Sequence, residues 1–366
     1  MNSSKNRKID KPTPFIPPLK QKAFRRNNLQ IRRNLQSLFR LLKSKFVTHW
    51  PIFLSHMITS HCDCKCRMCE YWRLGQREEL TLEQIQYMLD DAMRVGMTDY
   101  VIWGGEPLLR HDLPEAVVYA NKIGLDVSII TNGSLLSKRI NEVAPYLWGI
   151  IVSLDHPTAK EHDHLRRHPG LFEKILDGIE KAKAYNHLKI FLNCVIQKEN
   201  IHQLQEMAEL ARSLGVRITF EMMEVIKGYN DWLQPDHTEV IRATRQLVQL
   251  KREGFPISNS SSYFKAIAAR SPYSCQVPKV CVTILWDGQV RLCQTISEAA
   301  RPALPNYDLG NVTKASFQDI FRSQNYQRFI KAAEECWKCD LSYPRELALL
   351  ESYDLDAVWN FFSKIL

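Results

Sequence analysis

In the segment His61-Cys62-Asp63-Cys64-Lys65-Cys66-Arg67-Met68-Cys69-Glu70-Tyr71-Trp72, the three cysteines Cys62, Cys66 and Cys69 have the spacing CxxxCxxC. Three thiolates can bind three of the four irons of a [4Fe-4S] cluster and leave the fourth iron open to another ligand. A structural zinc site is the alternative, since Cys64 could supply a fourth thiolate. Structural zinc usually joins two separated pairs of ligands, so the spacing favours the cluster.

A predicted helix and a predicted strand follow the cysteines. Apolar residues at helical spacing predict a helix over Leu80–Gly96, and an apolar run predicts a strand over Tyr100–Trp103. The strand ends in Gly104-Gly105-Glu106-Pro107. Two glycines at this position allow the backbone to approach a ligand closely, and the proline fixes the turn beyond them.

Strands and helices alternate from Pro51 to about Met222, which predicts right-handed crossovers and a parallel sheet. The predicted strands lie near Phe53–Ile58 and over residues 100–103, 126–130, 149–153, 189–196 and 216–221, and further helices are predicted over Pro114–Ile123, Phe172–Ala184 and Ile201–Leu214.

These motifs, in this order, resemble the radical SAM superfamily. Besides CxxxCxxC and Gly-Gly-Glu-Pro, the resemblance rests on an aromatic residue near the third cysteine (Tyr71 or Trp72), on the strand ends Ile129–Gly133 and Ile151–Asp155, and on the segments His162–Arg166 and Pro169–Phe172. It implies an α/β fold, a partial (β/α)6 barrel of the TIM type with the active site at the carboxyl ends of the strands.

The resemblance also implies the chemistry. In that family the open iron binds S-adenosylmethionine, whose reductive cleavage gives methionine and a 5′-deoxyadenosyl radical that abstracts hydrogen from a substrate. By this match the catalytic cluster ligands are Cys62, Cys66 and Cys69. The residues that would contact S-adenosylmethionine are Gly104, Gly105, Glu106, Pro107, Thr131, Asn132, Ser153 and Arg166, with Arg167 as the neighbour that could replace Arg166.

A second cysteine group lies near the other end of the chain. Residues Ile284–Cys293 predict a hairpin that turns at Asp287-Gly288. The layout resembles the twitch domain, a shorter version of the SPASM domain, and implies an auxiliary [4Fe-4S] cluster on Cys275, Cys293, Cys336 and Cys339. A zinc ribbon is the alternative, and Cys281 could replace Cys275.

The composition indicates a globular protein of two or three domains, with 366 residues and 45% apolar content. Ten cysteines in ligand-like groups, without a secretory leader, predict the reducing cytoplasm, and Cys194 in an apolar strand is expected to be a small buried hydrophobe. No apolar run is long enough to span a membrane. The expected domains are a basic Pro-rich arm with an amphipathic helix (1–50), the barrel core (51–222), a linker with a helix over His237–Lys251 (223–274), the cluster domain (275–342) and a docking helix (343–366).

Residues 1–50 contain thirteen Lys and Arg and one acid, Asp10, in a chain of net charge +9. Apolar residues at helical spacing between Ile31 and Phe46, flanked by basic ones, predict an amphipathic helix. It could pack on the outside of the barrel, contact an anionic membrane peripherally through residues 29–46, or bind an acidic peptide. Nucleic acid is not expected, because no RNA-binding module is recognised.

The sequence therefore predicts a radical SAM enzyme, oxidoreductase-like, whose auxiliary cluster accepts or relays an electron during oxidation or maturation of a peptide, sugar or lipid-type substrate. A flavodoxin or ferredoxin is the expected electron donor. Glu221 and Glu224 could face the substrate cavity or act as capping carboxylates. The alternatives are radical addition or rearrangement of a lipid at the membrane surface, and a non-catalytic zinc- or iron–sulfur-binding protein.

Metal analysis separates these classes. After anaerobic reconstitution we expect about four irons and four acid-labile sulfides for each of the two sites. Zinc without sulfide would contradict the cluster assignment.

Overall fold

The computed structural model describes residues 50–293, 308–336 and 339–365. The predicted basic arm and its membrane-contact segment, residues 29–46, lie outside the described residues. Within the described residues, no helix is both long enough and apolar enough to cross a bilayer.

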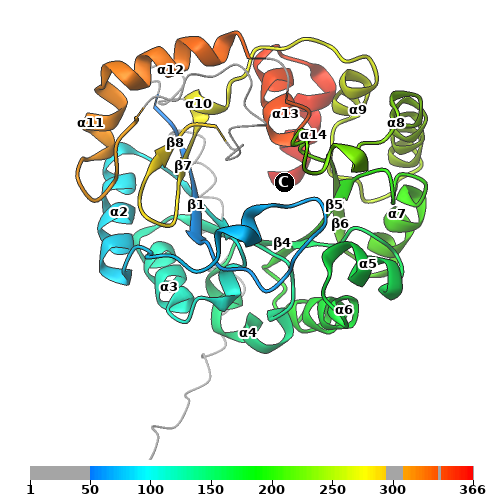
Figure 1. The fold of residues 1–366 in the computed structure, drawn as a ribbon, viewed down its shortest axis with the longest axis horizontal. Helices are drawn as coiled ribbons and strands as arrows, with labels where there is room; N and C mark the ends of the chain where they lie inside the picture. Colours follow the sequence, from blue (N-terminus) through cyan, green and yellow to red (C-terminus); the bar gives the residue numbers. More distant parts are fainter. Residues whose placement is uncertain (1–49, 294–307, 337–338, 366) are drawn as a thin grey trace, which may run out of the picture.

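One eight-stranded sheet, in the order β6-β5-β4-β3-β2-β1-β7-β8, forms the wall of an open barrel (Figure 1). The first six strands are parallel and each is linked to the next through helices, so the predicted α/β partial barrel is confirmed. The strands are β1 (Phe53–Thr59), β2 (Asp99–Gly104), β3 (Asp126–Thr131), β4 (Gly149–Ser153), β5 (Lys189–Ile196), β6 (Arg217–Met222), β7 (Cys281–Ile284) and β8 (Val290–Arg291).

Alternation along the strands separates the two faces of the sheet. Residues that pack under the helices, such as Tyr100, Ile129 and Val152, are fully buried. Their sequence neighbours face the inside of the barrel and are mostly half-buried, as the alternating burial along β6 shows. The hydrophobic core therefore lies mainly between the sheet and its outer helices, and the inner face carries a mixture of polar and apolar residues.

The helices form a ring outside the sheet (Figure 1). Each helix predicted between residues 80 and 251 is present within a few residues of its expected ends, whereas α4, α5 and α9 to α12 were not predicted, and the one docking helix expected in residues 343–366 is the pair α13 and α14. The helices are α2 (Leu82–Val95), α3 (Leu113–Ile123), α4 (Leu136–Val143), α5 (Ala159–Arg166), α6 (Leu171–Ala182), α7 (Leu204–Ser213), α8 (His237–Arg252), α9 (Ser261–Ala268), α10 (Val277–Val280), α11 (Phe317–Arg322), α12 (Gln324–Glu334), α13 (Ser342–Glu351) and α14 (Leu355–Ile365), with short 3-10 turns η2 (Tyr71–Leu74), η3 (Pro107–Leu109), η4 (Ala144–Tyr146) and η5 (Asp231–Leu233).

The predicted hairpin near the C-terminus extends the barrel sheet. β7 pairs in parallel with β1, in register Phe53↔Cys281, and antiparallel with β8. The C-terminal helices dock on the opposite edge, where Asn360 in α14 donates to the Ser258 carbonyl at 2.8 Å and accepts from Lys251 at 2.8 Å. The C-terminal part of the chain is thus attached to both edges of the six-stranded core, while the exact domain boundaries stay a prediction.

The glycine pair after β2 packs against the start of the cysteine loop, defined here as residues 60–81. A Cβ added to Gly105 would lie 2.0 Å from the His61 carbonyl oxygen, and one added to Gly104 would lie 2.5 Å from that of Thr59. The backbone N–H groups of Gly105 and Glu106 donate to these same two carbonyls at 2.9 and 2.8 Å. The close approach expected from the sequence is therefore made by the chain's own backbone.

A Gly105→Ala substitution tests this contact. Because the added methyl would collide with backbone that cannot move aside, we expect destabilisation by more than about 2 kcal/mol, seen as a lower Tm, and poorer cluster incorporation. Gly149→Ala, on a strand where the nearest atom would be 3.4 Å away, is the control and should have little effect. Equal Tm values for the two variants would contradict the interpretation.

Candidate functional site

The cysteine loop crosses the mouth of the barrel from β1 toward β5 and β6 (Figure 1). Two residues that follow β6 hold its far side. Tyr229 donates its hydroxyl to the Cys69 carbonyl at 2.7 Å, and the Asn230 amide donates to the Met68 carbonyl at 2.7 Å. The same Asn230 amide donates to the Glu224 carbonyl at 2.9 Å, so it ties the loop to the segment after β6.

Arg67, between the second and third cysteines, anchors the loop to three other elements. Its backbone N–H donates to the Leu165 carbonyl at 3.0 Å. Its guanidinium contacts Glu199 at 2.6 Å and the His164 ring nitrogen at 2.8 Å, and it lies 4.7 Å from the centre of the Trp232 ring. These contacts fix the position of the backbone that joins Cys66 to Cys69.

A half-buried carboxylate holds the base of the loop. Glu79 accepts from the Thr59 hydroxyl at 2.6 Å and from the Ser60 N–H at 2.9 Å. Arg110 pairs with Glu79 at 3.3 Å and donates to the Leu80 carbonyl at 2.6 Å. The two ends of the loop are therefore joined at the end of β1.

The cysteines of the loop lie together. The buried Cys64 thiol is within hydrogen-bond distance of the Cys62 and Cys66 sulfurs, and these two contacts raise its pKa far above the usual range. Burial raises the pKa of the Cys69 thiol to about 12, with Cys66 and Cys62 acting in the same direction. The Asn132 amide lies 3.8 Å from the Cys62 sulfur. Cys64 thus shares the site, and its assignment as a non-ligand stays a prediction.

Arg166 lies directly under the loop. It is buried, donates Nε–H to Asp155 at 2.6 Å and lies 3.8 Å from the Cys66 sulfur. Burial alone would lower the pKa of Arg166, but Asp155 and Cys66 raise it above its usual value. Asp155 is held in turn by the Val195 N–H at 2.9 Å. Ser153 ends β4 two residues before Asp155, at the same end of the barrel.

Glu106 connects the ends of two neighbouring strands. Its carboxylate accepts from the Thr131 hydroxyl at 2.7 Å, the Asn132 N–H at 2.6 Å and the Leu108 N–H at 3.0 Å. Complete burial raises the pKa of Glu106 to about 7 in spite of these hydrogen bonds. The structure therefore uses this carboxylate to position Thr131 and Asn132, and direct contact between any of the three and S-adenosylmethionine stays a prediction.

Unpartnered polar atoms surround the same barrel end. Ser134 Oγ after β3, His162 Nε2 in α5 and both side-chain polar atoms of Gln197 after β5 are buried and have no protein partner among the described residues. A buried polar group without a partner costs about 1–3 kcal/mol. A ligand rich in hydrogen-bonding groups, such as S-adenosylmethionine, fits this set of atoms.

The four predicted auxiliary ligands also lie together. Burial raises the pKa of Cys275 to about 12, and Cys336 and Cys293 act in the same direction. Burial likewise raises the pKa of Cys339, with Cys293 and Cys275 contributing. The Tyr273 hydroxyl donates to the Cys339 carbonyl at 2.8 Å and holds this corner in place.

Cys281 has different surroundings. It is buried on β7, and burial raises its pKa to about 12, while its neighbours are Tyr343, the Ser55 backbone and Thr283. Cys194 is fully buried on β5, as expected of a small hydrophobe. The geometry thus favours Cys275 over Cys281 as the fourth auxiliary ligand.

The two glutamates near the end of β6 have separate roles. Glu221 accepts from the Ser342 N–H and hydroxyl, both at 3.2 Å, so it caps the start of α13, as the capping alternative expected. Burial raises the pKa of Cys339, and the charge of the Glu224 carboxylate acts in the same direction. Only Glu224 stays a candidate for the space between the cysteine groups.

Among the described residues, no three His, Cys, Asp or Glu side chains are drawn together as ligands of a single metal ion. The thiolates of a [4Fe-4S] cluster each bind a different iron, so the donor set of two separate cysteine groups suits clusters.

Sequence reasoning missed Tyr229, Asn230, Glu79 and Arg110, which position the loop from distant parts of the chain. No local pattern marks them.

A cysteine loop over the mouth of a partial barrel, with a second cysteine group attached to the same sheet, defines an iron–sulfur enzyme of the barrel type. The family models agree: residues 57–211 match the radical SAM superfamily, and residues 275–340 match SPASM, an iron–sulfur cluster-binding domain. The chain belongs to the radical SAM superfamily and carries a SPASM domain. Its core binds a [4Fe-4S] cluster and S-adenosylmethionine, and its SPASM domain binds auxiliary iron–sulfur clusters.

Relatives of several activities resemble the chain. An AdoMet-dependent heme synthase of Methanosarcina barkeri is 31% identical over 46% of this chain, a match that spans about half (49%) of that relative. A second AdoMet-dependent heme synthase, from Oleidesulfovibrio alaskensis, is 25% identical over 77% of this chain and 78% of its own. A GTP 3′,8-cyclase of Marinobacter nauticus is 27% identical over 64% of this chain and 77% of the cyclase chain.

Solved structures share the fold. Streptococcus suis SuiB bound to S-adenosylmethionine superposes with a TM-score of 0.66 at 15% identity, over 89% of this chain and 80% of SuiB. The enzyme anSMEcpe with bound AdoMet has a TM-score of 0.62 at 16% identity, over 86% of this chain and 98% of its own.

Paired substitutions test the second cysteine group. We expect Cys275→Ala to lose most of about four irons and four sulfides, because it removes one of four thiolates, whereas Cys281→Ala should keep nearly all of them. Iron and sulfide analysis with electron paramagnetic resonance of the reduced proteins measures both. The opposite pattern would make Cys281 the ligand.

Proposed function

We propose that this enzyme cleaves S-adenosylmethionine reductively at a cluster on Cys62, Cys66 and Cys69 and oxidises a substrate held in the barrel, with a second cluster on Cys275, Cys293, Cys336 and Cys339. The proposal rests on one observation: a single side chain, Asn230, joins the cysteine loop to the segment of Glu224, whose charge acts on Cys339. The two cysteine groups therefore border the same space.

When bound, the first cluster supplies the electron that converts S-adenosylmethionine to methionine and a hydrogen-abstracting radical, and the second accepts the electron that the substrate gives up. The chain's own residues would bind S-adenosylmethionine and orient it. Arg166 uses one N–H for Asp155 and one for Cys66, and its other N–H groups stay available to a carboxylate. Ser153 at the end of β4 can donate its hydroxyl to the same group.

Asp155 would act by positioning Arg166. Its carboxylate is fixed between Arg166 Nε and the Val195 N–H, so the guanidinium cannot swing away from the loop. Gln197 and Ser134, each with unpartnered buried polar atoms, would supply hydrogen bonds to the rest of the S-adenosylmethionine molecule. Together these groups would hold the sulfonium near the open iron and keep water out.

Iron tetrapyrroles are the substrate class that we propose to assay first. Relatives named for this chemistry, AdoMet-dependent heme synthase and Fe-coproporphyrin III synthase, match 77% and 79% of this chain. Peptides come second, because SuiB, which has the same fold, has been solved with a precursor peptide. A flavodoxin or ferredoxin is the proposed electron donor.

Cleavage is measured as methionine and 5′-deoxyadenosine formed under anaerobic reduction. We expect Cys66→Ala to abolish both products, because it removes one iron ligand. Cys64→Ala, its control in the same loop, should retain iron and cleavage.

Substrate oxidation is read as one substrate consumed for each 5′-deoxyadenosine formed, with reduction of the auxiliary cluster followed by electron paramagnetic resonance. Cleavage that survives Cys66→Ala, or a fully loaded protein that forms neither product, would contradict the proposal.

A further inference from the structure

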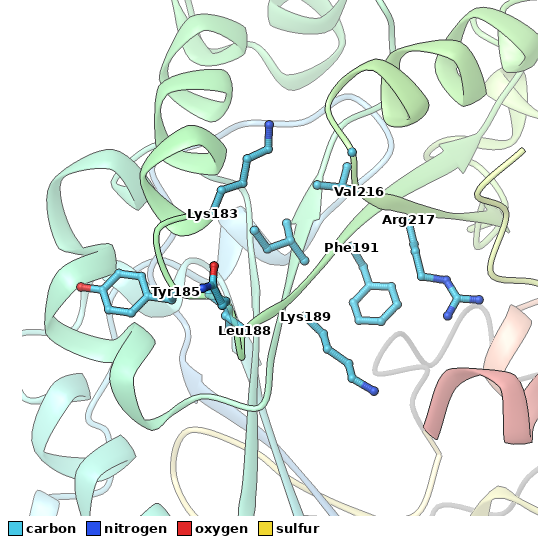
Figure 2. A pocket seen from close by; sticks show the side chains of 10 residues that line it. Lys183, Tyr185, Leu188, Lys189, Phe191, Val216 and Arg217 are labelled. Carbon is cyan, nitrogen blue, oxygen red and sulfur yellow. The ribbon is translucent and has the colours of Figure 1, made fainter. Parts of the chain in front are cut away.

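A cavity of about 470 Å³ lies at the amino ends of β5 and β6, at the opposite end of the barrel from the cysteine loop (Figure 2). It is lined by the turn that leads into β5, by the first residues of β5 and by the turn that leads into β6. In barrels of this type the amino ends usually serve stability. Basic side chains at this end therefore require a separate explanation.

The strand register places two cations and an aromatic ring on one face. Arg217 on β6 is directly opposite Phe191 on β5, and Lys189 precedes Phe191 by two residues, so all three side chains point to the inner face. Figure 2 shows Lys189, Phe191 and Arg217 projecting to the same side, whereas Tyr185 projects to the other.

The cations at this face differ in their surroundings, since the starts of β2 and β3 carry Asp99 and Asp126. Asp126 on β3 is close enough to Lys189 to influence its pKa, which burial and Arg217 together lower. No carboxylate among the described residues pairs with Arg217, and burial lowers its pKa as well. A half-buried guanidinium that faces a second cation is stabilised by an anion between them.

The apolar lining of the cavity combines aliphatic side chains with the Phe191 ring. The Phe191 ring stacks on Trp148, with ring centres 6.3 Å apart and an angle of 19° between the planes. The Lys189 ammonium lies 4.9 Å from the centre of the Trp148 ring, so the stack holds this cation in position. A flat ligand can therefore pack on Phe191 while its charged group reaches the cations.

We propose that this cavity binds a small organic anion, with its phosphate or carboxylate between Lys189 and Arg217 and its flat apolar part against Phe191. The site is separate from the cysteine loop, since β5 runs its full length between them. Its volume is that of a site for a small molecule, within the usual range of about 300–1,000 Å³. Phosphates and carboxylates share this chemistry, and probes of both kinds distinguish them.

The test is calorimetric titration of the full-length, cluster-loaded protein at low salt with phenyl phosphate, benzoate, inorganic phosphate and, as the neutral probe, benzyl alcohol. We expect saturable binding of phenyl phosphate or benzoate, weaker binding of inorganic phosphate and none of benzyl alcohol. Arg217→Gln should weaken binding by at least about tenfold, because it removes a charged donor. Phe191→Leu should weaken the aromatic anions and leave inorganic phosphate unchanged.

Lys174→Gln, an exposed residue of α6 away from the cavity, is the matched control and should bind like the parent protein. S-adenosylmethionine should not compete, and its cleavage should be unchanged in Arg217→Gln. Absence of saturable binding, binding that is indifferent to Arg217→Gln, or displacement by S-adenosylmethionine would each overturn the proposal.

Discussion

The close backbone contact between the end of β2 and the end of β1 is the constraint on which the site depends. Gly104 and Gly105 lie against the carbonyls of Thr59 and His61, and two backbone hydrogen bonds seal the contact. Any side chain at Gly105 would push the chain away just before Cys62. The first thiolate is therefore placed by a strand that carries none of the cluster ligands, which explains why a glycine pair one βα unit later accompanies the cysteines.

Polar residues then turn a positioned loop into a rigid one. Glu79 and Arg110 join its ends, Arg67 anchors its tip, and Asn230 holds the backbone before Cys69. Each of these groups is buried or half-buried and paired, as charged and amide side chains must be when they leave water. A loop of 22 residues whose only regular structure is the short 3-10 turn η2 needs such support to keep a fixed shape.

Local pattern predicted the strands well, because each is an apolar run bounded by turn residues, and the six parallel strands agree with expectation to within a few residues. It failed where polar residues begin a helix: Ser258–Ser262 resembles a linker, yet Ser260 caps α9 through the Tyr263 N–H. The cysteines of the site could be identified from spacing. Their supports could not, since Asp155 and Arg166, or Glu79 and Arg110, meet only after the barrel has closed.

β1 is paired on both sides, with β2 and with β7. The loop of the first cysteine group leaves its carboxyl end, and the hairpin that leads to Cys293 is hydrogen-bonded along its flank. The segments that carry both cysteine groups are therefore attached to the same strand, β1. The rate of electron transfer falls steeply with distance. The strands of a hydrogen-bonded sheet lie about 4.8 Å apart, and this spacing varies little. Because the cysteines themselves lie on loops that leave this sheet, the distance between the two centres depends on the sheet and on the side chains that fix those loops.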